Sequence, residues 1–202
     1  MEPLAHGGDL AAARRMFPDA PEPFIDLSTG INPHPYPLPA LPPEIFARLP
    51  DRAAVRQVTA IAAQAYGAPS ADHALPAPGT QILLPMVARL APPGRAAILR
   101  TTYAEHERAA ILAGHRVDSI DNVGAAGGSE LVIVVNPNNP DGSVAPRDTL
   151  LPLAKQLART GGLLVVDEAF ADVAPTGTSL AGDVGRGNIL VLRSFGKFFG
   201  LA

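Results

Sequence analysis

The sequence predicts an α/β fold in which a mainly parallel sheet is sandwiched between helices. Three short runs, Leu131–Val135, Leu163–Val166 and Ile189–Leu192, are continuously apolar, which is typical of parallel strands buried on both faces. Stretches with helical periodicity separate these runs, and alternation of strands with helices favours a parallel sheet. The hydrophobic content of 47% against 17% charged residues indicates a chain that buries a large core.

The first 50 residues predict a proline-rich, extended N-terminal arm ahead of one large domain over residues 51–202. Prolines occupy every second position of the segment 32–39, and each of them fixes φ and removes a backbone donor. Residues 51–66 then place apolar side chains at helical intervals and end before Gly67. We therefore expect a helix over residues 51–66.

The remaining elements alternate along the chain. We expect a helix near residues 82–90, a strand at 96–99, a helix near 105–113, the strand 131–135, a helix near 147–160, and the strands 163–166 and 189–192. In such a sheet a ligand lies beyond the carboxyl ends of the strands. The polar residues that follow the strands are therefore expected to converge: Asn139, Asp167, Ser194 and Lys197.

Composition argues against several classes of function. The net charge is −3 and the sequence pI is about 5.9, so the basic surface that nucleic-acid binding requires is not expected. The chain has no cysteine and its five histidines are scattered, so we expect no disulfide and no metal site. No apolar run approaches the roughly 18 residues of a membrane span, and no targeting segment is evident at the start. A soluble cytoplasmic protein is the default expectation.

Asp167 follows four apolar residues of a predicted strand, where a carboxylate is costly to bury without a positive partner. A protonated pyridine nitrogen would be such a partner. The alternative is an acid at an exposed strand end or at a helix N-cap, which is the commoner situation. Glu168 is expected to be the solvated member of this acidic pair.

Lys197 lies between Gly196 and the apolar segment 198–200, three residues after Ser194. Desolvation of a lysine favours its neutral amine, which is the form that attacks an aldehyde. The alternative is a lysine whose ammonium group reaches solvent. Ser194 could donate to a phosphate or could cap a turn.

Three further segments could contact the same ligand. Asn139, in a loop with two Asn-Pro steps, offers an amide to a ligand oxygen, although Asn, Pro, Asp and Gly are also ordinary turn residues. The segment Gly79-Thr80-Gln81 opens a predicted helix, where backbone N–H groups could hold a phosphate or simply form a turn. Tyr103 could stack on a flat ligand or lie partly buried in the core.

In this order, Asn139, Asp167 and Ser194-Phe195-Gly196-Lys197 resemble the motifs of the fold-type I pyridoxal phosphate (PLP) enzymes, the aspartate aminotransferase superfamily. The segments 26–33, 102–109 and 6–8 are similar to those of the threonine-phosphate decarboxylases of cobalamin biosynthesis. Histidinol-phosphate aminotransferases are near relatives of that branch. The resemblance covers nearly all 202 residues and implies a mainly parallel, seven-stranded-type sheet.

The resemblance implies a PLP-dependent lyase that decarboxylates O-phospho-L-threonine to aminopropanol phosphate and forms a homodimer. Lys197 would form the Schiff base with PLP, and Asp167 would pair with the pyridine nitrogen. The other implied contacts are Asn139 at the ring hydroxyl, Tyr103 stacked on the ring, Ser194, Gly79, Thr80 and Gln81 at the cofactor phosphate, and Asn32 and His6 at the substrate. An aminotransferase of the histidinol-phosphate type, or an inactive fragment of either enzyme, is the alternative.

Three positions depart from the family pattern. Phe170 stands where aminotransferases usually have a tyrosine, which favours the decarboxylase branch. Leu49 stands where many relatives have a tyrosine that reaches the cofactor phosphate of the neighbouring subunit. The sequence stops at Ala202, before the family's next arginine and its small C-terminal domain, so we expect a truncated form.

Overall fold

A computed structural model describes residues 7–201 of the chain. The chain divides into two compact units. The larger unit is Pro37–Ser194, and the smaller unit combines the segments Met1–Tyr36 and Phe195–Ala202. Each unit is described by itself below.

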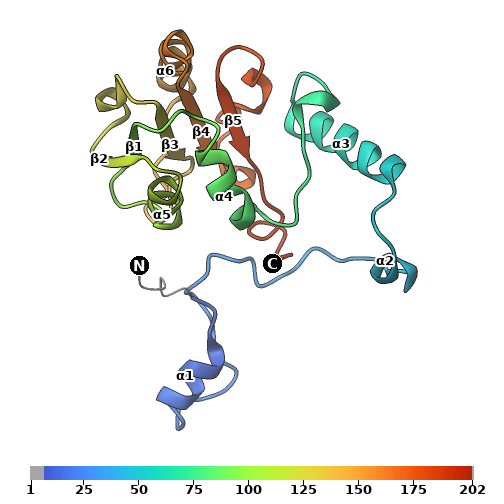
Figure 1. Ribbon diagram of the computed structural model, residues 1–202. Helices are drawn as coiled ribbons and strands as arrows, with labels where there is room; N and C mark the ends of the chain where they lie inside the picture. Colours follow the sequence, from blue (N-terminus) through green and yellow to red (C-terminus); the bar gives the residue numbers. More distant parts are fainter. Residues whose placement is uncertain (1–6, 202) are drawn as a thin grey trace. The chain divides into compact units, whose positions relative to one another are not determined.

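The larger unit contains a five-stranded sheet in which every pair of neighbouring strands is parallel (Figure 1). The strand order is β2-β1-β3-β4-β5, so the chain crosses over between β2 and β3 and then proceeds outward to β5. The strands are β1 (Arg95–Leu99), β2 (Arg116–Ile120), β3 (Leu131–Val135), β4 (Leu163–Asp167) and β5 (Ile189–Leu192). The predicted α/β class is confirmed, and the described residues form five strands where the resemblance implies seven.

Helices cover both faces of this sheet. On one face α6 (Arg147–Thr160) packs Leu150, Leu153 and Leu157 against strand residues that include Val132. On the other face α4 (Thr80–Ala88) and α5 (Glu105–Leu112) pack against the alternate strand residues, such as Ile133. Successive strand residues point to opposite faces, which is why a continuously apolar strand such as β3 supplies two cores at once.

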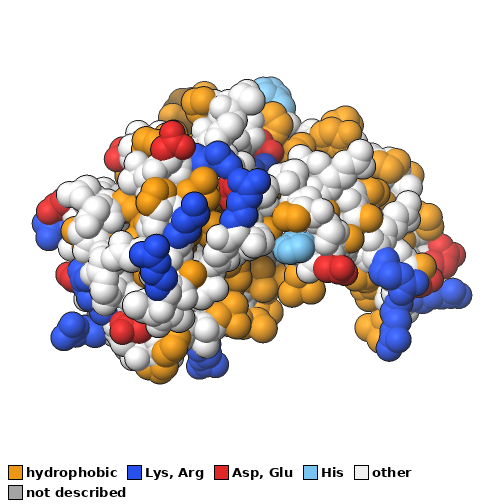
Figure 2. All heavy atoms as spheres, turned by 90° about the horizontal axis from the view of Figure 1, so that it is seen from above, with side chains coloured by type: hydrophobic (Ala, Val, Ile, Leu, Met, Phe, Trp, Pro, Cys, Tyr) orange, Lys and Arg blue, Asp and Glu red, His pale blue; other side chains and the backbone are white. Residues whose placement is uncertain are grey.

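The predicted helix 51–66 is confirmed as α3 (Arg52–Tyr66). The Asp51 side chain accepts a hydrogen bond from the Ala53 N–H, and the helix ends at Gly67 in the left-handed conformation with φ 72°. Of its side chains only Ala63 is buried. Apolar side chains are therefore exposed along α3, and Figure 2 shows hydrophobic side chains at the surface of this part of the larger unit.

The structure also contains elements that the sequence analysis did not predict. The proline-rich arm is not extended throughout, because it holds the short helices α1 (Leu10–Met16) and α2 (Glu44–Ala47). The edge strand β2 was missed because its sequence, Arg-Val-Asp-Ser-Ile, is mostly polar. The described residues also contain four short 3₁₀ helices: η1 (Ala71–His73), η2 (Val123–Ala126), η3 (Ala171–Val173) and η4 (Ala181–Asp183).

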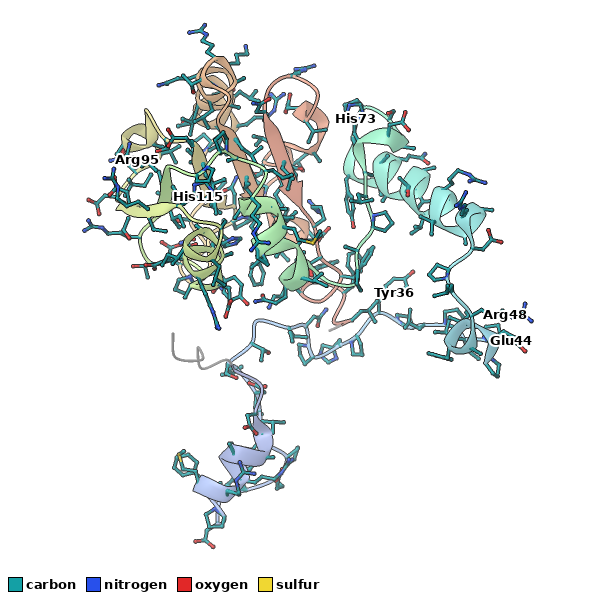
Figure 3. The ribbon with its side chains drawn as sticks, viewed as in Figure 1. Tyr36, Glu44, Arg48, His73, Arg95 and His115 are labelled. Carbon is teal, nitrogen blue, oxygen red and sulfur yellow. The ribbon has the colours of Figure 1, made fainter. Side chains whose placement is uncertain are left out.

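At the amino end of β1, Arg95 ties the strand to the segments beside it (Figure 3). Its guanidinium donates to the Asp118 carboxylate at 2.9 Å and to the carbonyl oxygens of Ala125 and Gly127. His115, also labelled in Figure 3, donates from Nε2 to the Ala88 carbonyl at 2.8 Å and so joins the end of α5 to the end of α4. Arg95 and His115 thus join neighbouring segments at the amino ends of the strands by hydrogen bonds.

In the smaller unit, residues 32–36 run beside residues 197–200. Backbone hydrogen bonds join the Asn32 N–H to the Lys197 carbonyl at 3.0 Å and the Tyr36 N–H to the Phe199 carbonyl at 2.8 Å. Gly200 has φ 63°, and a Cβ there would lie 2.7 Å from the Asn32 carbonyl oxygen, so the contact requires glycine. In neither unit do the described residues include a helix long and apolar enough to span a membrane.

Candidate active site

In the larger unit, the carboxyl ends of three adjacent strands carry residues that the sequence analysis singled out. Asn139 follows β3, Asp167 is the last residue of β4, and Ser194 follows β5. Tyr103 follows β1, the other neighbour of β3. Because the strands are parallel, these ends share one edge of the sheet. Lys197 belongs to the smaller unit and is described with it.

Asp167 is a buried carboxylate with two partners. Its Oδ1 accepts a hydrogen bond from the Ala169 N–H at 3.0 Å, and its Oδ2 lies 2.8 Å from Nε2 of His106. The side chain is only 8% exposed, so the interpretation as an exposed strand end is wrong. An ionised carboxylate has about four acceptor positions. Asp167 can therefore accept a further donor from a ligand.

His106 is a residue of the site that the sequence analysis missed. It lies in the first turn of α5, is 1% exposed, and meets the Tyr103 ring edge to face with centroids 5.8 Å apart. A carboxylate only accepts, so the shared hydrogen requires the proton on His106 Nε2. The available signal was its position three residues after Tyr103, which places both side chains on one side of the helix start.

Tyr103 lies half-buried between the sheet edge and α4. Its hydroxyl donates to Oε1 of Gln81 at 3.1 Å. Burial raises the pKa of Tyr103 above its ordinary value of 10.0, and the nearby carboxylates of Glu105 and Asp167 raise it further. The ring is thus held at both ends, by His106 at its edge and by Gln81 at its hydroxyl.

The segment Gly79-Thr80-Gln81 opens α4, which begins two residues earlier than predicted. Gly79 is the N-cap, with φ 103°, and among the described residues no side chain caps the first turn. The first N–H groups of the helix therefore remain available, and the helix dipole favours a negative charge beside them. This start of α4 is suited to hold a phosphate.

The loop after β3 places its three asparagines differently. Asn136 and Asn138 are buried, and Asn139 is partly exposed. The Asn136 side-chain amide donates to the Ala145 carbonyl and accepts from the Ala145 N–H. Asn138, which the sequence analysis did not single out, bonds Thr102 and the Thr101 carbonyl. Within residues 7–201, the Asn139 side chain has no hydrogen-bond partner, so its amide can meet a ligand.

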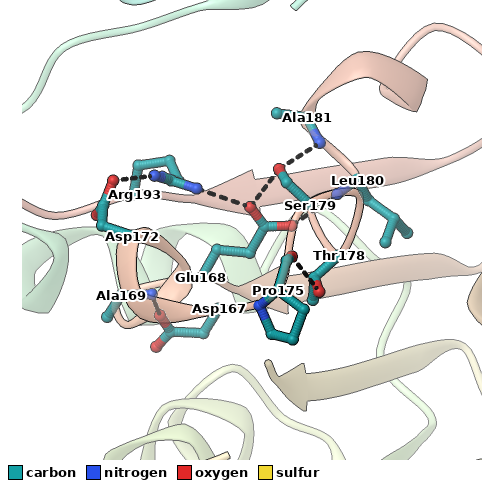
Figure 4. A network of polar contacts seen from close by, with 10 residues as sticks. All are labelled: Asp167, Glu168, Ala169, Asp172, Pro175, Thr178, Ser179, Leu180, Ala181 and Arg193. Carbon is teal, nitrogen blue, oxygen red and sulfur yellow. Dashed lines mark hydrogen bonds and ion pairs between the residues drawn. The ribbon is translucent and has the colours of Figure 1, made fainter. Parts of the chain in front are cut away.

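Glu168 is fully buried, so the expectation of a solvated carboxylate is wrong (Figure 4). It accepts hydrogen bonds from the Ser179 hydroxyl at 2.6 Å and from the Leu180 N–H at 2.7 Å, and it pairs with Arg193 at 3.2 Å. Adjacent residues of a strand end point to opposite faces. Asp167 therefore meets α5, while Glu168 meets the segment 178–181 on the other side.

Arg193 connects Glu168 to two further groups. Its second terminal nitrogen donates to Asp172 at 2.7 Å, and its guanidinium carbon lies 4.4 Å from the centre of the Tyr66 ring. Its Nε is buried without a hydrogen-bond partner among the described residues. Arg193 immediately precedes Ser194, so this network fixes the end of β5 beside the end of β4.

In the smaller unit, Lys197 is partly buried and its Nζ donates to the Thr29 carbonyl at 3.3 Å. The Asn32 amide donates to the Phe198 carbonyl at 2.8 Å and accepts from the His34 N–H at 2.9 Å. Asn32 thus supports the backbone beside Lys197, and its place at the substrate stays a prediction. His6, the other predicted substrate residue, lies outside the described residues.

Comparisons with known proteins match the chain to one protein family and to two threonine-phosphate decarboxylases. The family described as aminotransferase class I and II matches residues 70–202. A threonine-phosphate decarboxylase from Sinorhizobium sp. is 47% identical over 99% of this chain, and one from Pseudomonas aeruginosa is 42% identical over 98%. Among solved structures, a PLP-dependent cyclase named OrfR matches all of this chain and 59% of its own, with a TM-score of 0.71 and 23% identity.

This chain is shorter than the proteins it matches. It spans 60% of the Sinorhizobium relative and 59% of the Pseudomonas relative. At 23% identity, the likeness to the solved cyclase shows a shared fold.

Proposed function

Because this chain belongs to the aminotransferase class I and II family, we propose that it binds PLP and contributes the cofactor-binding part of a threonine-phosphate decarboxylase. The observation that carries the proposal is the buried Asp167 carboxylate, which is fixed by His106 and has acceptor capacity left for a protonated ring nitrogen. A buried carboxylate of this kind is costly without a positive partner.

The other residues of the sheet edge fit the rest of the cofactor. The Tyr103 ring is partly exposed and flat enough to stack on a pyridine ring, and the Asn139 amide can donate to the ring hydroxyl. The N–H groups at the start of α4 and the Ser194 hydroxyl would hold the phosphate. Lys197, three residues after Ser194, would bind the cofactor aldehyde through its Nζ.

Bound PLP would supply the electron sink that stabilises negative charge at the substrate Cα. The residues of this chain would orient the cofactor ring and supply protons to the ring nitrogen and to the substrate Cα. Asp167 would keep the ring nitrogen protonated, and Tyr103 would fix the plane of the ring. When the carboxylate of O-phospho-L-threonine leaves as CO₂, a proton must replace it at Cα. The substrate amino group would by then have displaced the Lys197 Nζ from the cofactor aldehyde, and the released, protonated Lys197 is our candidate donor.

The substrate assignment is supported by the names of the two relatives and by Phe170, which stands where aminotransferases usually have a tyrosine. We propose Asn32 and His6 as substrate-binding residues. The product would be aminopropanol phosphate, an intermediate of cobalamin biosynthesis, and the assembled enzyme would be a homodimer.

Cofactor binding can be tested cleanly because the chain has only two lysines, Lys155 on α6 and Lys197. We expect an absorbance band at the edge of the visible range when PLP is added, and borohydride should fix the cofactor onto Lys197. The band should persist in Lys155→Arg and vanish in Lys197→Arg. A label on Lys155, or no band at all, would contradict the proposal.

The reaction is tested by supplying O-phospho-L-threonine and measuring CO₂ and aminopropanol phosphate. A parallel sample with 2-oxoglutarate measures transfer of the amino group. Turnover that depends on the keto acid and releases no CO₂ would favour an aminotransferase of the histidinol-phosphate type. Release of CO₂ without a keto acid would support the decarboxylase.

A further inference from the structure

The turn after β1 has an unusual backbone. Thr101 has φ 52°, and it is the only residue other than glycine with positive φ among those that the structure describes. A β-branched residue is strongly disfavoured in this left-handed region because its side chain crowds the backbone. Contacts elsewhere in the fold must therefore hold Thr101 in place.

Asn138 provides these contacts. Its Nδ2 donates to the Thr101 carbonyl at 3.1 Å, and its Oδ1 accepts from the Thr102 hydroxyl at 2.6 Å. Nδ2 also donates to Asp141 at 2.8 Å, and the Asn138 main chain bonds Ser143 and Gly142 in its own loop. The side chain is buried, at 6% exposed, so these hydrogen bonds are shielded from competing water.

The residue after this turn is Tyr103, which contacts two other parts of the site. Its hydroxyl reaches Gln81 in the first turn of α4, and its ring meets His106, the partner of Asp167. The loop that carries Asn138 also carries Asn139. A displacement of the Thr101 turn would therefore move Tyr103 relative to the other proposed cofactor contacts.

We propose that Asn138 is a positioning residue for the cofactor site. Its amide holds Thr101 in the left-handed conformation, anchors the Thr102 hydroxyl, and thereby fixes the Tyr103 ring relative to the Asn139 loop. Asn139 contacts the ligand, and Asn138 acts through Tyr103. The cofactor part of this inference rests on the proposed function, whereas the placement of Tyr103 does not.

The test combines Asn138→Ala with Thr101→Gly. Glycine adopts positive φ without strain, so Thr101→Gly should restore the turn that Asn138→Ala releases. We expect Asn138→Ala to weaken PLP binding by about tenfold or more, as measured by absorbance titration, and the double variant to recover most of this loss.

A matched control is Asn188→Ala. Asn188 also bridges two segments, by donating to the Gly162 carbonyl at 2.9 Å, but it lies at the amino ends of β4 and β5. Asn188 is exposed, so this variant should lose little stability and keep its affinity for PLP within about twofold, and adding Thr101→Gly should leave that affinity unchanged. If Asn138→Ala lowers stability but leaves PLP affinity unchanged, or if Thr101→Gly rescues nothing, the proposal is overturned.

A second readout is independent of PLP. The chain has three tyrosines and no tryptophan, so with Tyr36→Phe and Tyr66→Phe the tyrosinate absorbance reports Tyr103 alone. The pKa of Tyr103 should lie above 10.0, fall toward that value in Asn138→Ala, and rise again with Thr101→Gly. A chain that binds no PLP but shows this pattern would refute the proposed function and retain Asn138 as the residue that places Tyr103. An unchanged Tyr103 titration would overturn the inference.

Discussion

The imidazole of His106 lies 2.8 Å from the Asp167 carboxylate, and both side chains are buried. The histidine comes from α5 and the aspartate from the end of β4, so the pair ties a covering helix to the sheet edge. The same imidazole meets the ring of Tyr103. His106 thus fixes two of the proposed cofactor contacts at once.

His106→Phe should destabilise the chain by about 1–3 kcal/mol, because it removes the donor to a buried acceptor without leaving a large cavity. Urea unfolding measures the loss, and PLP titration should show weaker binding. His73→Phe is the control, since His73 is exposed and its side chain bonds the neighbouring Ser70 hydroxyl rather than a buried carboxylate. Equal effects of the two substitutions would show that the contact between His106 and Asp167 contributes nothing.

Arg193→Met should cost about 3–5 kcal/mol of unfolding free energy, because Glu168 would keep a buried charge without its cation. Adding Glu168→Leu should recover much of this loss by removing the unpaired charge. The control is Arg186→Met, because Arg186 is 67% exposed and its pair with Asp183 should be worth less than about 1 kcal/mol. Full stability of Arg193→Met alone would contradict the network in Figure 4.

Stability should fall in alkaline solution as two tyrosines titrate. Burial raises the pKa of Tyr66 and of Tyr103 above the ordinary 10.0, with nearby carboxylates adding to both shifts and Arg193 opposing that of Tyr66. Above pH 10 the folded chain holds protons that the unfolded chain has lost, so stability is full below this pH and falls as pH rises through the folded values. Unfolding of Tyr66→Phe and Tyr103→Phe across this range should show a weaker pH dependence than the unaltered chain.

Leu150→Ala should cost about 2–5 kcal/mol, because the side chain is fully buried between α6 and the sheet. Leu90→Ala should change stability by less than about 0.5 kcal/mol, since Leu90 is 66% exposed. Thermal unfolding compares the two variants. Similar melting temperatures would contradict the placement of α6 against the sheet.

Two pairs of neighbouring residues show that the sequence did not predict the burial and the partners of individual side chains. Asn138 and Asn139 are chemically identical. Asn138 is nevertheless buried and donates a hydrogen bond to the Thr101 carbonyl, whereas Asn139 is partly exposed. Asp167 and Glu168 were both recognised, but the partners of Glu168 lie 11 to 25 residues further along the chain. His106 was missed because its partner is 61 residues away. A local sequence pattern does not indicate contacts between residues so far apart along the chain.

The sequence by itself determined most helices and strands of the larger unit, though not the polar edge strand β2, and it indicated which polar residues follow the strands. Apolar periodicity and capping residues are local properties, so they predicted α3, α6, β3, β4 and β5 closely. The tertiary structure decided the strand order, the burial of Glu168, the pairing of His106 with Asp167 and the strained turn at Thr101. These features depend on packing between distant segments, where the cost of burying a charge or straining a residue is offset by partners that only the folded chain brings near.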